Sequence, residues 1–162
     1  MLFITKPQWL LVFFLSFHVF VFSQNPNTNL NLDKKNLALS GYDLIEYYNN
    51  KAIKGNSKHE SIHEGARYHF KSLKNKLLFE KNPLKYTPQY GGWCAYAMGY
   101  NGEKVSVNPE SFSIENDKLY LFYKTFFNDT KSKWNKNTAE LKNNAEENWN
   151  KLLNSPKNEN KY

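Results

Sequence analysis

The chain has 162 residues, a formal net charge of +7 and an aromatic content of 17%. Its positive charge comes from lysines that are scattered along the sequence, and Arg67 is the only arginine. Because no basic cluster or base-reading motif accompanies these cations, we exclude nucleic acid as a partner.

The first 23 residues have the layout of an export signal. Lys6 precedes an apolar run of 14 residues, Trp9 to Phe22, and the small residue Ser23 comes before Gln24. A helix that crosses a bilayer needs about 20 residues. We therefore predict a signal peptide over 1–23, a periplasmic or secreted protein, and no stable membrane insertion after cleavage. An uncleaved membrane anchor is the alternative.

The remainder has the length of one domain. The polar, asparagine-rich stretch 24–36 predicts a flexible lead, 37–153 the domain, and 154–162 a disordered tail. Residues 51–65 predict a loop with a short strand. The alternation in 67–70 predicts a strand with Tyr68 and Phe70 on one face.

Two amphipathic stretches predict helices. Ser72 is placed to cap the first, over 72–82, which ends before Pro83. The second covers 139–153, with Asn137 and Glu140 as a cap pair. The expected apolar residues of the first helix are Leu73, Leu77, Leu78 and Phe79, and those of the second are Leu141, Ala145, Trp149 and Leu152.

Residues 112–123 predict a β-hairpin with Asn116-Asp117 as a two-residue turn, since both residue types tolerate positive φ. With a turn of this length, apolar residues of the two strands face each other, and residues of opposite charge face each other next to the turn. The expected pairs are Glu115 with Lys118, Ile114 with Leu119, and Phe112 with Leu121. We therefore predict an α+β fold, in which the central and C-terminal helices cover a small, mainly antiparallel sheet.

Residues 59–63 read His-Glu-Ser-Ile-His and match the zinc-protease pattern H-E-x-x-H. That chemistry needs both histidines on one buried helix, with a third ligand further along the chain. Here glycines flank a polar segment and no third-ligand motif follows. We interpret the match as a solvated loop, with surface zinc on His59 and His63 as an alternative.

Cys94 is the only cysteine, so it cannot form an internal disulfide. It follows two glycines in Tyr90-Gly-Gly-Trp-Cys-Ala-Tyr-Ala-Met98, which suggests that the turn places its sulfur. Met98 lies four residues later on the same face, and two sulfur ligands suit Cu(I). Buried packing, soft-metal binding and thiol chemistry are the three interpretations of this segment.

Several motifs together resemble the exported bacterial YHS-domain proteins. They are Gly41-Tyr-Asp43, Gly65-Ala-Arg-Tyr-His-Phe-Lys-Ser72, Tyr86-x-Pro-Gln-Tyr-Gly-Gly-Trp-Cys-Ala95, Lys118-Leu-Tyr-Leu121 and Asn148-Trp149. The resemblance covers about residues 36–153 and implies metal binding, because related modules occur in copper pumps and mercury-handling enzymes. This chain departs from those modules at Lys71, where they carry a cysteine, and it lacks their paired upstream cysteines.

From these observations we expect an exported YHS-like module that binds copper or zinc through Cys94. Met98, His69, His63 and His59 are the candidate co-ligands. The alternatives are a thiol-redox protein that uses Cys94, and a non-catalytic protein- or ligand-binding module in which Cys94 is buried. We expect no catalytic residue and no organic cofactor.

Overall fold

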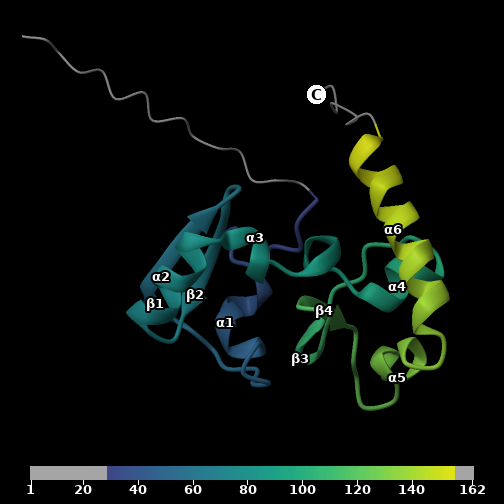
Figure 1. Ribbon diagram of the computed structural model, residues 1–162, viewed down its shortest axis with the longest axis horizontal. Helices are drawn as coiled ribbons and strands as arrows, with labels where there is room; N and C mark the ends of the chain where they lie inside the picture. Colours follow the sequence, from purple (N-terminus) through teal and green to yellow (C-terminus); the bar gives the residue numbers. More distant parts are fainter. Residues whose placement is uncertain (1–28, 156–162) are drawn as a thin grey trace, which may run out of the picture.

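The structure is a computed structural model that describes residues 29–155 (Figure 1). The predicted signal, the start of the predicted lead and residues 156–162 lie outside the described residues. In chain order the elements are η1 (Leu39–Gly41), α1 (Leu44–Tyr47), β1 (Asn56–His63), β2 (Ala66–Phe70), α2 (Leu73–Lys81), α3 (Pro83–Tyr86), η2 (Gln89–Gly92), α4 (Ala95–Tyr100), β3 (Asn108–Glu115), β4 (Lys118–Phe122), α5 (Thr130–Trp134) and α6 (Thr138–Asn154).

The predicted α+β class is confirmed, with two antiparallel two-stranded sheets in place of one. The β1–β2 sheet and α2 form one end of the described region, while α4, α5 and α6 form the other, with β3–β4 between them (Figure 1). Two apolar cores follow this division. One is centred on Leu44, Phe70 and Phe79, and the second on Met98 and Trp134.

The β3–β4 hairpin has the predicted register. Glu115 pairs with Lys118, Ile114 with Leu119, and Phe112 with Leu121. Asn116 and Asp117 adopt φ of 51° and 57°, the left-handed values that a tight two-residue turn requires. The local prediction held because the turn length alone determines which residues face each other.

Strand β1 is longer than the short strand expected within 51–65. It pairs with β2 from His63 opposite Ala66 back to Asn56 opposite Phe70, with an irregularity before Glu60. Its first three residues are exposed, which explains why the sequence shows no apolar alternation there. The H-E-x-x-H stretch therefore lies on a strand, and the expectation of a solvated loop was wrong.

Helix α2 begins as predicted, because the Ser72 side chain accepts a hydrogen bond from the Asn75 N–H at 3.2 Å. The predicted apolar face is correct at Phe79, which is buried, but wrong at its leucines. Leu73 and Leu77 are each 55% exposed, and the second residue that the helix buries is the polar Asn75.

A buried polar network explains this face. The Asp43 carboxylate is fully buried and accepts hydrogen bonds from the backbone N–H groups of Ile45 and Lys71, at 2.8 and 2.7 Å. The Asn75 amide donates to Asp43 at 2.8 Å and to Glu46 at 2.9 Å. These bonds join α1, the end of β2 and α2, so α2 docks through an amide as well as through Phe79.

Helix α6 packs mainly against α4 (Figure 1) and also contacts the β3–β4 hairpin, where Lys142 forms an ion pair with Glu115 at 2.6 Å. Leu141 and Ala145 are buried, as predicted. A Cβ atom on Gly99 would lie 2.3 Å from the Leu141 carbonyl oxygen, so only glycine permits this approach of the two backbones. The predicted cap pair forms through the side chains of Asn137 and Glu140, without a cap bond to the backbone.

Residues 29–36, expected as part of a flexible lead, make defined contacts with the domain. The Asn31 N–H donates to the Gly91 carbonyl at 2.8 Å, and Leu32 bridges to Ala38. The Trp93 indole N–H donates to the Asn29 carbonyl at 2.7 Å. The chain therefore contacts the domain from residue 29 onward, because backbone groups of this polar stretch form hydrogen bonds with η2 and with Trp93 just after it.

Candidate functional site

Cys94 is fully buried, immediately before α4. Its backbone N–H donates to the Val105 carbonyl at 2.9 Å. Its Sγ lies 3.4 Å from Thr130 Oγ1 and accepts the Tyr123 N–H at 3.3 Å. Because the Thr130 hydroxyl donates its single proton to the Tyr123 carbonyl at 2.7 Å, the S–H of Cys94 is the donor to Thr130. These contacts suit a packed thiol.

Met98, the expected second sulfur ligand, is also fully buried and belongs to the core formed with Trp134. Its N–H donates to the Cys94 carbonyl at 3.0 Å, so the two residues lie one helical turn apart as the sequence predicts. Its carbonyl accepts the Asn148 amide of α6 at 2.9 Å.

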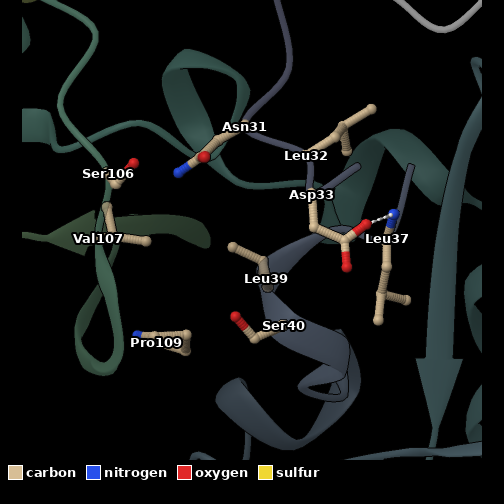
Figure 2. Close-up of a pocket in the computed structure, with 9 residues that line it drawn as sticks. All are labelled: Asn31, Leu32, Asp33, Leu37, Leu39, Ser40, Ser106, Val107 and Pro109. Atoms are coloured by element: carbon tan, nitrogen blue, oxygen red, sulfur yellow. Dashed lines mark hydrogen bonds between the residues drawn. The ribbon is translucent and has the colours of Figure 1, made fainter. Parts of the chain in front are cut away.

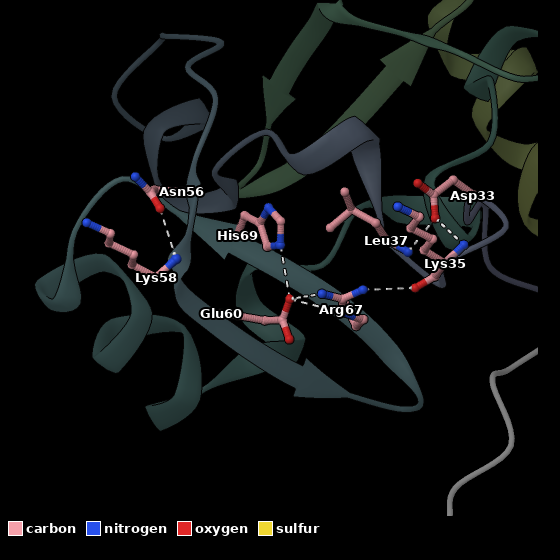
Figure 3. Close-up of polar contacts among 8 residues, drawn as sticks. All are labelled: Asp33, Lys35, Leu37, Asn56, Lys58, Glu60, Arg67 and His69. Carbon is pink, nitrogen blue, oxygen red and sulfur yellow. Dashed lines mark hydrogen bonds and ion pairs between the residues drawn. The ribbon is translucent and has the colours of Figure 1, made fainter.

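His69 lies in an ion cluster on the β1–β2 sheet (Figure 3). One oxygen of Glu60, Oε2, is 3.0 Å from His69 Nε2 and accepts the Nε and Nη2 groups of Arg67 at 2.9 and 2.6 Å. The Arg67 hydrogen bonds hold the pKa of Glu60 below its usual value, against partial burial, with a further contribution from His69. This cluster joins the two strands.

His59 and His63 share the strand of Glu60. Side chains alternate along the regular part of the strand, so Glu60 and His63 point to opposite faces, while His59 lies in the irregular part of the pairing. This differs from the helical arrangement of a zinc protease. His63 packs edge-on against Phe79, and its Nε2 is buried without a hydrogen-bond partner among residues 29–155.

The structure does not bring the five candidate ligands together. The histidines lie on the β1–β2 sheet, whereas Cys94 and Met98 lie at α4 near the other end of the described region (Figure 1). Within residues 29–155, no group of three or more His, Cys, Asp or Glu side chains is placed to hold a metal ion.

A groove of about 480 Å³ is the feature that the sequence did not indicate. Four stretches of chain form it: Leu30, the β1–β2 turn with its flanking strands, the segment from α3 to η2, and the last turns of α6. Its lining residues are Leu30, His63, Glu64, Tyr68, Leu84, Thr87, Pro88, Gln89, Tyr90, Gly91, Glu146, Trp149, Asn150 and Leu153.

Three aromatic rings line the groove, those of Tyr68, Tyr90 and Trp149, and the last two meet edge-on with centroids 6.3 Å apart. Burial raises the pKa of Tyr68 to about 12, with a smaller effect of Glu64. Burial also raises the pKa of Tyr90, assisted by Tyr120 and Glu146. Both phenols are therefore neutral at pH 7 and keep a proton to donate.

The η2 turn shapes this wall. Tyr90, Gly91 and Gly92 all have positive φ, at 53°, 61° and 83°. A Cβ atom on Gly91 would lie 2.7 Å from the Asn29 carbonyl oxygen and 3.0 Å from the Trp149 ring. The glycine pair, expected to place the Cys94 sulfur, thus brings residue 29 and Trp149 against the turn.

The charge of the groove is opposite to that of the whole chain. Among residues 29–155, Glu64 and Glu146, both exposed, are the acidic residues that line it, and no lysine or arginine of this range does so. The chain as a whole carries +7. The groove is therefore suited to an aromatic or apolar group that carries a positive charge.

A smaller pocket of about 240 Å³ lies between residues 31–40 and 106–109 (Figure 2). Its one carboxylate, Asp33, already accepts the backbone N–H groups of Lys35 and Leu37 at 2.7 and 2.9 Å. These bonds, that of Leu37 above all, lower the pKa of Asp33. Because this carboxylate serves a turn, the pocket is the weaker candidate.

Comparison of the chain with family models, with curated proteins and with solved structures finds no match in any of the three. The resemblance to YHS-domain proteins therefore stays a prediction. No helix within residues 29–155 is long and apolar enough to cross a membrane.

Proposed function

We propose that this chain is an exported, non-catalytic binding module that takes a small organic amine with an aromatic or apolar body. The observation that carries the proposal is the groove between η2 and α6, with its aromatic walls and two carboxylates. Its volume of about 480 Å³ lies within the ~300–1,000 Å³ range of small-molecule sites.

Each part of the ligand has a matching group in the groove. A flat body can pack against Trp149 and Tyr90, and an ammonium group can lie over a ring while it faces Glu146 or Glu64. The Tyr68 and Tyr90 hydroxyls make no hydrogen bond within residues 29–155, so they are free to donate to a polar ligand atom.

The unpartnered His63 supports the same site. A buried nitrogen without a hydrogen bond is uncommon in folded proteins and costs stability. His63 lines the groove, and a ligand that shifts its ring slightly can supply the missing partner.

Of the three interpretations of Cys94, the packed thiol agrees best with its contacts. The sulfur has no exposed surface and takes part in two hydrogen bonds. Soft-metal binding and thiol redox chemistry each need an accessible sulfur or a change of structure around it. Copper or zinc binding stays a prediction that metal analysis of the exported protein can decide.

Export and the YHS resemblance belong to the same proposal. We expect protein from the native envelope to begin at or near Gln24, since Ser23 follows the apolar run. Intact-mass measurement checks this start. A full-length mass in the membrane fraction would contradict it and indicate an anchor.

Two probes of equal size and opposite charge test the groove. We expect phenethylamine to bind with a Kd on the order of 1 mM, as suits a fragment. Its amide chemical-shift changes should centre on η2 and the last turns of α6. Phenylacetate, which has the same ring and a negative charge, should bind at least about fivefold more weakly. Equal binding of the two probes, or shifts centred elsewhere, would contradict the proposal.

A further inference from the structure

The loop between β4 and α5 presents two phenylalanines to solvent. Phe126 and Phe127 are each 94% exposed, and their rings meet edge-on with centroids 4.9 Å apart. We call this pair the aromatic tip. Leaving two large apolar side chains in water is unfavourable relative to their burial, so such a pair indicates an interaction surface.

The exposure of the two rings follows from the structure of the loop, because contacts between its two ends hold it in place. Lys124 and Asp129 form an antiparallel bridge and an ion pair at 3.2 Å. The Thr125 N–H donates to the Asn128 carbonyl at 2.8 Å. Asp129 then caps α5 by accepting the Lys131 N–H at 3.0 Å. The aromatic tip is therefore held away from both cores.

Lysines flank the aromatic tip along the chain. The stretch 124–136 contains four lysines and one acidic residue, Asp129, which is paired with Lys124. Helix α5 follows the loop directly and lies beside it at the same end of the molecule (Figure 1). Lys133 on α5 and Lys136 just after it are exposed.

We propose that the aromatic tip inserts into the interfacial layer of a membrane that contains anionic phospholipid. Exposed aromatic rings beside lysines are the features that peripheral proteins use at this layer. Each nearby lysine adds attraction to anionic headgroups.

A membrane fits the aromatic tip better than a protein partner does. Neither ring lines the groove or its neighbouring pockets, so the tip is a projection. Two phenylalanine side chains bury about 150–250 Å² each, whereas a stable protein interface needs about 800 Å² per partner. A lipid layer accepts a small projection without a matching surface.

Vesicle binding of the exported protein tests the proposal. We expect binding to vesicles of phosphatidylcholine with phosphatidylglycerol, and weaker binding to phosphatidylcholine alone or at high salt. Phe126→Ser and Phe127→Ser should each reduce partitioning about tenfold, and the double variant about a hundredfold. Ile62→Ser is the matched control, since Ile62 is 67% exposed on β1 at the other end of the molecule. It should bind as the wild type does.

Three results would overturn the proposal: no vesicle binding by the wild type, equal binding by the double variant, or an equal loss in Ile62→Ser. Analytical sedimentation without lipid tests the other possible occupant of the tip, a second copy of this chain. A wild-type dimer that becomes a monomer in Phe126→Ser/Phe127→Ser would show that a second copy of the chain covers the tip. Because the groove lies elsewhere, its amine binding should not change in these variants.

Discussion

At the scale of single residues, two hydrogen bonds to the sulfur of Cys94 favour a packed thiol over a ligand or a nucleophile. The lone cysteine suggested a ligand or a nucleophile because of its sequence context. In the structure, the S–H of Cys94 donates to the Thr130 hydroxyl, and its sulfur accepts the Tyr123 N–H. A sequence cannot reveal these partners, since they lie 29 and 36 residues further along the chain.

We expect Cys94→Ser to lower the free energy of unfolding by about 1–2 kcal/mol, because a smaller, more polar group replaces a buried sulfur. Urea unfolding measures this loss. The wild-type thiol should react slowly with a thiol reagent in the native protein and rapidly once unfolded. Copper or zinc that is bound by the wild type and lost in Cys94→Ser would restore the metal interpretation.

Glu60→Gln should lower the free energy of unfolding at pH 7 by about 0.5–1 kcal/mol, the range for a partly exposed ion cluster. Arg67 lowers the pKa of Glu60 below its usual 4.5. The charged form is therefore the stabilising one, and its contribution is present above about pH 4.5 and lost as the pH falls through the lowered pKa.

The difference between wild type and Glu60→Gln should consequently shrink in unfolding curves measured from pH 7 down to pH 3. Glu103→Gln, a change at an exposed position outside the cluster, is the control and should have little effect at any pH. A difference that grows on acidification would show that the cluster does not stabilise the fold through the charged carboxylate.

At the scale of elements, predictions succeeded where neighbours in sequence determine the structure. The hairpin register followed from a two-residue turn, and the Ser72 cap from its position before α2. The buried face of α2 could not be predicted in this way. It depends on Asp43 and Glu46, which lie about 30 residues earlier and receive the Asn75 amide.

Asn75→Ala should therefore lower the free energy of unfolding by about 2–3 kcal/mol, because it removes the amide donor that two buried carboxylates share. Asp43 keeps the N–H groups of Ile45 and Lys71, whereas Glu46 loses its donor from α2. Leu77→Ser on the same helix should cost less than about 0.5 kcal/mol, since Leu77 is 55% exposed. Chemical denaturation of both variants measures the ranking. A larger loss in Leu77→Ser would show that the apolar face predicted from sequence is the buried one.

At the scale of the whole molecule, the groove exists only because distant segments meet. Its walls come from residues near positions 30, 64, 90 and 149, and no local pattern connects them. In the sequence, residues 90–92 attract attention because they precede the cysteine, and Trp149 is one position in the apolar stripe of a helix. In the structure, Gly91 lies against the Trp149 ring, so the two segments form one wall of the groove.

The binding of phenethylamine to two neighbouring variants of α6 tests the proposed groove most directly. Glu146 lines the groove, whereas Glu147 lies outside it and is 72% exposed beside Lys151. Both changes, Glu146→Gln and Glu147→Gln, remove one negative charge from the same helical turn. We predict that the Kd rises about threefold in Glu146→Gln, as for the loss of an exposed ion pair, and stays unchanged in Glu147→Gln. Equal effects of the two changes, or none from Glu146→Gln, would contradict amine binding in this groove.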